Sequence, residues 1–247
     1  MNDAEQQSLH WTTAAETHRG MRRQINEDAI LVRSEMGLWA VADGMGGHEA
    51  GDVASDMVTK SLGSLERGQS LSRFVDDVDD TLIGINRKLR THASQNFEGR
   101  TMGCTIVALI AGGRVGVCLW AGDSRLYRLR TGELRQITRD HSPLEEAVDS
   151  GVMTAAEAAQ RSESNVITRA VGGQEELHLD IIVFEVEPND TYLLCSDGLY
   201  RELHDEEMLE ILTSRSVEDS VDDLLDCALE RGARDNVSII VSKANAA

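Results

Sequence analysis

The chain has 247 residues and is strongly acidic, with 43 Asp and Glu residues against 24 Lys and Arg residues. Nucleic acids and anionic membranes bind basic protein surfaces, so the composition excludes both as partners. Hydrophobic residues make up 41% and charged residues 27%, which is typical of a globular protein and excludes a disordered one. With only two prolines and no linker rich in Pro, Gly or Ser, we expect residues 1–247 to form a single domain.

No stretch approaches the roughly 20 apolar residues that a membrane-spanning helix needs, and the polar N-terminus does not resemble a signal peptide. The four cysteines are widely spaced and form neither a Cys-x-x-Cys motif nor a metal-ligand spacing with histidine. We therefore expect reduced, buried cysteines in a cytoplasmic protein.

The first part of the chain predicts a pair of strands followed by two helices. Apolar runs at 29–32 and 38–42 indicate a strand hairpin. Apolar residues then recur at helical spacing over 53–65 and again over 71–89. The second helix carries aspartates between 76 and 80, which we interpret as a solvated face because the residue order of a calcium loop is broken.

The rest of the chain contains more strands and a second pair of helices. Two further hairpins are predicted, 104–110 with 115–120 and 125–130 with 133–137. A polar, Ala-rich segment follows, with a helix capping box at Thr154 and Glu157. The remaining elements are strands at 181–186, 192–195 and 237–241 and helices at 205–212 and 217–231, the second of which ends at Gly232. This order favours antiparallel sheets covered by helical hairpins over a regular βαβ winding.

Aspartates follow three of the predicted strands and precede a fourth. They are Asp43, Asp123, Asp197 and, before the last strand, Asp235. If these strands lie side by side, the carboxylates converge and repel one another, and protonation or a cation relieves such repulsion. A set of oxygen ligands without His or Cys suits Mg²⁺ or Mn²⁺ rather than zinc. The spacing alone leaves ordinary Asp-Gly turns open as the alternative.

A glycine-rich loop occupies residues 44–51. Its glycines lack the spacing of a dinucleotide or Walker loop, and its acidic residues would repel a bare phosphate, so a nucleotide site is excluded. His48 lies in this loop, either as a proton donor to a leaving group or as a structural histidine. Arg23 precedes the first predicted strand, where its guanidinium can hold a phosphoryl group through two hydrogen bonds unless it is an ordinary surface arginine.

Five motifs occur in one order along the chain. They are Arg-x-x-Asn-Glu-Asp at 23–28, Ala-Asp-Gly-Met-Gly-Gly-His at 42–48, Ala-Gly-Asp-Ser-Arg at 121–125, Cys-Ser-Asp-Gly-Leu at 195–199 and Arg-Asp-Asn-Val-Ser at 234–238. With these motifs the chain resembles the metal-dependent protein phosphatase (PPM) family, protein phosphatase type two C, in its compact bacterial form. The resemblance covers residues 17–241.

The resemblance implies an α+β fold, a four-layer α-β-β-α sandwich of two antiparallel sheets flanked by helical hairpins, with two Mn²⁺ or Mg²⁺ ions at one end. It implies that Asp43 bridges both ions and that Gly44 offers its carbonyl to one of them, while Asp197 and Asp235 hold the other. It further implies that Asp123 helps to bind a third, weaker ion and that Glu27 and Asp28 support the ions. Arg23 is implied to bind the substrate phosphate, and residues 140–172 to form a mobile flap.

The resemblance also implies the mechanism. A water between the two metals attacks phosphorus in line, the metals and Arg23 stabilise the phosphoryl charge, and His48 or a metal-bound water protonates the departing Ser or Thr oxygen. Two residues depart from the family pattern. Met45 follows Asp-Gly where many eukaryotic members have a histidine, which leaves the general acid open, and Cys104 replaces a threonine without an expected redox role.

The implied function is hydrolysis of phosphoserine and phosphothreonine in proteins, in a bacterial cytoplasm, opposing Ser/Thr kinases of the eukaryotic-like type and acting on their substrates. Some relatives of this size work in type VI secretion control. No apolar stripe is left unassigned, which predicts a monomer.

Two alternative functions stay open. One is a pseudophosphatase that binds phosphoproteins without turnover, which the complete aspartate set disfavours. The other is an enzyme of the same fold acting on small phosphoesters or on phosphorylated anti-sigma antagonists.

Overall fold

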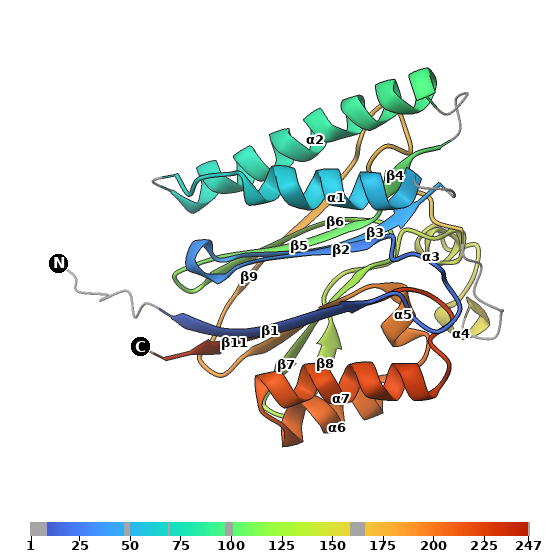
Figure 1. Cartoon of the computed structure of the whole chain (residues 1–247). Coiled ribbons are helices and arrows are strands. Elements are labelled where there is room, and N and C mark those ends of the chain that lie inside the picture. The colour runs from blue at the N-terminus through green and yellow to red at the C-terminus, as the bar shows by residue number, and fades with distance from the viewer. Residues whose placement is uncertain (1–8, 47–49, 69, 97–100, 159–165, 247) are drawn as a thin grey trace.

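The computed structural model describes residues 9–46, 50–68, 70–96, 101–158 and 166–246, which form two stacked antiparallel sheets (Figure 1). The first sheet has the order β2 (Asp28–Arg33), β3 (Leu38–Met45), β5 (Ile106–Gly112), β6 (Val115–Ala121) and β9 (Asp180–Glu185), with β4 (Gly103–Cys104) paired to β3. The second has the order β1 (His10–His18), β11 (Val237–Asn245), β10 (Thr191–Cys195), β7 (Arg125–Arg130) and β8 (Glu133–Gln136).

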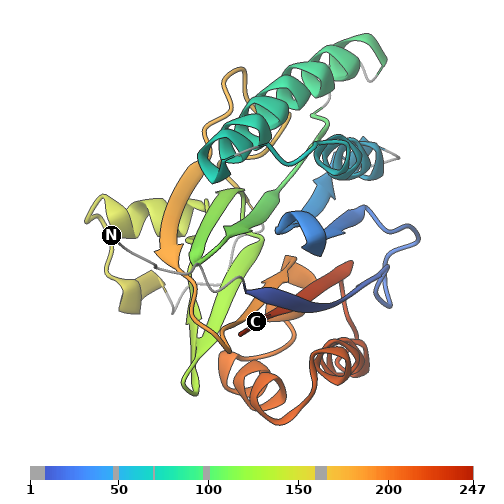
Figure 2. The same cartoon turned by 90° about the vertical axis from the view of Figure 1, so that its left-hand side faces the viewer.

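Two pairs of helices cover the outer faces of the sheets, as Figures 1 and 2 show. The first sheet is covered by α1 (Ala50–Gly63) and α2 (Leu71–Asn96), and the second by α6 (Asp205–Ser214) and α7 (Val217–Glu230). The shorter elements are η1 (Ser34–Met36), α3 (Pro143–Asp149), α4 (Ala155–Ala158) and α5 (Asp197–Tyr200). The predicted α-β-β-α sandwich is confirmed.

Three apolar layers result, one between the sheets and one under each helical pair. The alternation of side chains along a strand sorts residues between these layers. In β3, for example, Leu38 packs under α1 and α2, whereas Trp39 is fully buried between the sheets. The nearly continuous apolar runs of the sequence follow from burial on both faces of each sheet.

Strand β1 and helix α5 were not predicted from the sequence. In β1 few residues are strongly apolar, and the strand is held by its pairing with β11 and by hydroxyl pairs such as Thr13 Oγ1 to Ser242 Oγ at 2.7 Å. Helix α5 is a single turn, too short for an apolar period to mark it. The predicted capping box is confirmed, because the Thr154 N–H donates to Glu157 Oε2 at 2.8 Å.

All four cysteines are free, and Cys104, Cys118 and Cys195 are buried in strands as predicted, whereas Cys227 is only partly buried on α7. Within the described ranges no helix combines the length and the apolar character needed to cross a membrane.

The end of β3 lies unusually close to two neighbouring backbones, those of the Glu27 loop and of the first turn of α1. The Gly44 N–H donates to the Glu27 carbonyl oxygen at 3.0 Å. A Cβ atom on Gly44 would lie 2.3 Å from the carbonyl oxygen of Gly51 and 2.4 Å from that of Glu27. Glycine is therefore required at this point by backbone packing.

We predict that Gly44→Ala lowers the free energy of unfolding by about 1–3 kcal/mol, because the new methyl group overpacks the contact between β3 and α1. Gly84→Ala is the matched control, since its Cβ would meet nothing within 4 Å on α2. That change should stabilise the protein by roughly 0.5–1 kcal/mol through helix propensity. Urea unfolding of both variants measures the difference, and equal effects would contradict the packing argument.

Candidate functional site

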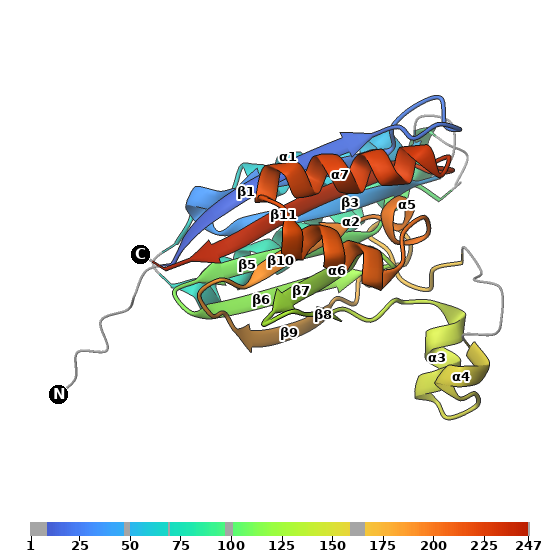
Figure 3. The same cartoon turned by 90° about the horizontal axis from the view of Figure 1, so that it is seen from below.

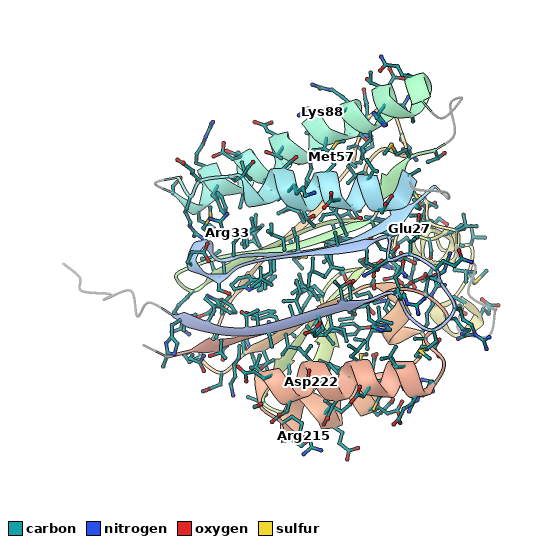
Figure 4. All side chains as sticks on the ribbon, in the orientation of Figure 1. Glu27, Arg33, Met57, Lys88, Arg215 and Asp222 are labelled. Carbon is teal, nitrogen blue, oxygen red and sulfur yellow. The ribbon has the colours of Figure 1, made fainter. Side chains whose placement is uncertain are left out.

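Seven of the nine predicted site residues line a cleft of about 260 Å³ at one end of the sandwich, whereas Asp28, the cross-strand partner of Asp43, does not line it. Its lining consists of Arg23, Glu27, Asp43, Gly44, Met45, Gly46, Thr105, Asp123, Ile167, Asp197 and Asp235. In Figure 4 this end is marked by Glu27. It is also the end at which α5 lies and from which α3 and α4 project (Figure 3).

Both sheets deliver acidic side chains to this end. Asp43 lies in β3 of the first sheet and faces its cross-strand partner Asp28 in β2. Asp123 follows β6 of the same sheet, whereas Asp197 follows β10 and Asp235 precedes β11 in the second sheet. The strand ends therefore bring these carboxylates to one end of the sandwich.

Burial and mutual repulsion raise the pKa of Asp28, Asp43 and Asp197. The pKa of Asp43 is raised well above its ordinary value, first by burial and then by the charges of Asp28 and Asp197, with smaller contributions from Asp123 and Asp235. Burial is also the main cause that raises the pKa of Asp28 to about 6 and that of Asp197 to about 7. An ionised set of these groups therefore needs nearby positive charge.

Three of these acidic groups have a carboxylate oxygen without a hydrogen-bond partner among the described residues. Asp28 Oδ2 accepts hydrogen bonds from Ser196 Oγ at 2.8 Å and Ser238 Oγ at 2.7 Å, which ties the first sheet to the second. Among the described residues no hydrogen-bond partner exists for Asp28 Oδ1, Glu27 Oε1 or Asp197 Oδ1, although all three are buried. Buried, unpartnered carboxylate oxygens are the donors that a hard divalent ion takes.

Two arginines approach the carboxylates. Arg23, half exposed, donates to Asp235 Oδ2 at 2.6 Å, and this hydrogen bond is the main cause that raises its pKa. Arg201, which the sequence analysis missed, lies 3.3 Å from Asp123 Oδ2 and 3.1 Å from Asp197 Oδ2. Its only signal in the sequence is its position four residues after Asp197.

Asn236 holds the loop that carries Arg23 and Glu27, and it was also missed as a functional residue. Its Oδ1 accepts from the Glu27 N–H at 2.9 Å, and its Nδ2 donates to the carbonyl oxygens of Arg19 at 2.9 Å and Ile25 at 3.0 Å. The motif around Asp235 contains this asparagine, but a sequence does not reveal which distant backbone groups a side chain satisfies.

Thr105 performs a similar task for β3. Its Oγ1 accepts from the Asp43 N–H at 3.1 Å and pairs with Ser124 Oγ at 2.7 Å, so the backbone of Asp43 is tied to the end of β6.

The site is spread out and not closed around an ion. In the described ranges no three acidic, His or Cys side chains already stand together as a ready-made metal cage. The ion pairs of Asp123, Asp197 and Asp235 with the two arginines fit this arrangement, since each draws a carboxylate toward a guanidinium. His48 lies outside the described residues, as does the part of the predicted flap at 159–165.

Comparison with known proteins identifies the family. The sequence model of the family described as Protein phosphatase 2C matches residues 16–240. The chain belongs to this family. The prediction of the family is therefore confirmed.

Similar proteins include the serine/threonine protein phosphatase PstP of Mycobacterium tuberculosis, which is 37% identical over 93% of this chain. The chain spans only 44% of the length of PstP. It spans 94% of a serine/threonine phosphatase stp of Listeria innocua, to which it is 32% identical over 93% of its own length.

Two solved structures extend the comparison. PppA, described as a key regulatory component of T6SS in Pseudomonas aeruginosa, superposes with a TM-score of 0.88 at 41% identity, covering 95% of this chain and 98% of that one. The catalytic domain of PstP in complex with two manganese ions superposes with a TM-score of 0.84 at 36% identity, covering 96% of this chain and 100% of that one.

The raised pKa values of the cleft predict an unusual pH dependence of the metal-free protein. Because the folded-state pKa values of Asp28 and Asp197 lie near 6 and 7, above the ordinary value, protonation favours the folded state. In EDTA, the free energy of unfolding should therefore fall as the pH rises from about 4, the ordinary pKa of Asp, through 7, by about 1.4 kcal/mol in total for each unit of pKa shift. Added Mn²⁺ should remove this fall.

Thermal unfolding at several pH values measures the trend. Asp43→Asn should flatten it, because the amide removes a titrating group whose pKa burial and the neighbouring charges raise well above the ordinary value, whereas Asp222→Asn on the exposed face of α7 serves as the matched control. If Asp43→Asn and the wild type lose stability with the same slope, Asp43 does not contribute to the trend.

Proposed function

We propose that this chain hydrolyses phosphoserine and phosphothreonine in proteins with the help of two Mn²⁺ or Mg²⁺ ions bound in the described cleft. The observation that carries the proposal is the buried carboxylate cluster around Asp43, whose repulsion requires cations at neutral pH. The manganese ions of the PstP complex support the same assignment for a relative.

The donor set of this chain fits such ions. Asp43 would contact both ions, Gly44 would offer its carbonyl oxygen, and Asp197 and Asp235 would complete the set, while Glu27 and Asp28 support it through their unpartnered oxygens. When bound, the ions would supply an acidified water as nucleophile and positive charge for the phosphoryl oxygens.

Arg23 would hold the substrate phosphate. Its guanidinium lines the cleft and is half exposed, so a phosphate can reach it from solvent. In this structure the Arg23 guanidinium pairs with Asp235, and an ion bound by the Asp235 carboxylate would weaken that pairing. The guanidinium is then free to bind two phosphoryl oxygens and to stabilise their charge during transfer. We keep His48 as the proposed proton donor to the departing oxygen, with a water as the alternative.

The predicted flap at 140–172 is anchored where it leaves and rejoins the sandwich. His141 Nδ1 accepts from the Gly122 N–H at 3.0 Å, and its carbonyl oxygen accepts from the Thr168 N–H at 2.8 Å. Ile167 lines the cleft beside these anchors. We propose that residues 17–241 form the phosphatase domain and that the flap contributes to the recognition of substrate.

We further propose phosphorylated proteins as partners, with a Ser/Thr kinase and its substrates as the opposing pair. The likeness to PppA supports type VI secretion control as the setting. The four free thiols support a cytoplasmic location. A monomer is part of the same proposal.

The proposal predicts Mn²⁺-dependent hydrolysis of a phosphothreonine peptide that EDTA abolishes. Asp197→Ala should lower kcat/KM by at least about 100-fold, because removing an ion ligand weakens the electrostatic stabilisation of the transition state. Asp222→Ala removes an exposed acid from α7 and serves as the control. A wild type that binds the peptide with Mn²⁺ or Mg²⁺ present and never releases phosphate would be a phosphoprotein-binding module instead.

Arg23→Ala should lower kcat/KM by roughly 10- to 150-fold, which corresponds to the 1.5–3 kcal/mol of a hydrogen bond to a charged group. Arg22→Ala is the matched control, because Arg22 is exposed on the same loop and does not line the cleft. Steady-state kinetics on the same phosphopeptide measure both variants. Equal effects of the two changes would remove Arg23 from the phosphate site.

A further inference from the structure

Arg201 lies between Asp123, which was expected to help bind a third ion, and Asp197, which was expected to hold one of the two main ions. Its guanidinium contacts Asp123 Oδ2 at 3.3 Å and Asp197 Oδ2 at 3.1 Å. The arginine side chain is 19% exposed and the two carboxylates are 12% and 11% exposed, so this group of charges is largely shielded from water. Pairs this well shielded are screened far less by salt than surface pairs.

The backbone sets this position. Asp197 begins α5 and Arg201 caps its C-terminal end, with the Arg201 N–H donating to the Asp197 carbonyl oxygen at 3.1 Å. Side chains four residues apart lie on the same face of one helical turn, so the guanidinium reaches the Asp197 carboxylate.

The adjacent residue is fixed as well. The Arg125 guanidinium stacks on the ring of Tyr200 at 3.5 Å from its centre. Arg125 also donates to both carboxylate oxygens of Asp140, at 3.0 Å and 2.7 Å. The end of α5 is therefore held from the side of the flap, and Arg201 extends from a fixed base.

The two oxygens of Asp197 are used differently. Oδ2 contacts Arg201, whereas Oδ1 is buried and has no hydrogen-bond partner among the described residues. One oxygen is thus available to an ion of the two-metal site while the other stays with the arginine. Asp123 Oδ2 contacts the same guanidinium, so Asp123 and Asp197 share one cation that belongs to the chain itself.

The sum of the charges in the site agrees with two divalent ions and one arginine between Asp123 and Asp197. The carboxylates named for the site are Glu27, Asp28, Asp43, Asp123, Asp197 and Asp235, and the arginines paired with them are Arg23 and Arg201. When all are ionised, the remaining four negative charges equal the charge of two divalent ions. A third divalent ion would add positive charge beside a guanidinium that already balances the same oxygens.

We propose that Arg201 is a built-in cation that takes the place of the third divalent ion, so that this chain works with two ions. The inference rests on the proposed two-metal function and deepens it, because it corrects the third-ion role expected for Asp123. In this chain Asp123 holds Arg201, and Arg201 in turn orients the Asp197 carboxylate toward the two-metal site.

The test is the number of Mn²⁺ ions bound, measured by isothermal titration and by metal analysis after rapid buffer exchange. The wild type should bind two ions. Arg201→Met, which keeps an unbranched stem and removes the charged guanidinium, should gain a third ion whose affinity is at least about tenfold above any further binding by the wild type. Arg215→Met is the control, because Arg215 pairs with Asp223 on the surface at 2.6 Å.

A second change decides whether the gained ion lies at the expected place. Asp123→Asn combined with Arg201→Met should return the number of ions to two, and Asp123→Asn alone should leave it at two. A third ion in the wild type that Asp123→Asn removes would overturn the proposal, and so would an Arg201→Met protein that folds and still binds only two ions. If Arg201→Met does not fold, the wild type and Asp123→Asn still decide the question.

Failure of this inference is separable from failure of the proposed function. A wild type that hydrolyses the phosphopeptide and binds three ions through Asp123 refutes the role of Arg201 alone. A wild type that binds Mn²⁺ without hydrolysing the peptide refutes the enzyme proposal, whatever the number of ions.

Discussion

The repulsion between buried carboxylates is the constraint on which the rest of this structure depends. Asp43 sits among other acids, and burial together with their charges raises its pKa well above the ordinary value. Such a cluster destabilises the folded chain unless protons, guanidinium groups or metal ions balance it. Arg23 and Arg201 balance part of the charge, and the negative charge that remains is the physical reason for which we propose a site for divalent ions.

The sandwich supplies the rigidity that holds these charges together. Three apolar layers fix the strands, and polar side chains then join the strand ends across the two sheets. Asp28 accepts hydrogen bonds from serines of the other sheet, and Asn236 fastens the loop that carries Glu27. The same contacts that position the acidic side chains thus prevent the strand ends from separating under the repulsion between those side chains.

Much of the architecture and of the acidic site was predictable from the sequence, because apolar runs buried on both faces mark strands and each of three runs ends on an aspartate. Strand β1 was not predictable, since hydroxyl pairs such as Thr13 with Ser242 replace apolar burial. Arg201 was missed because its role depends on how a single helical turn brings its side chain to two carboxylates of different sheets. The sequence motifs locate the acidic residues of the site, but they do not reveal which arginine balances the charge of those residues.

The central claim is that two divalent ions complete this carboxylate cluster. Anomalous diffraction at the manganese absorption edge, on crystals of the wild-type protein grown with Mn²⁺, tests it most directly. The account predicts two peaks that share Asp43 as a ligand, with Arg201 still between Asp123 and Asp197. Peaks that lie away from Asp43, or a cleft without any peak at saturating Mn²⁺, would contradict it.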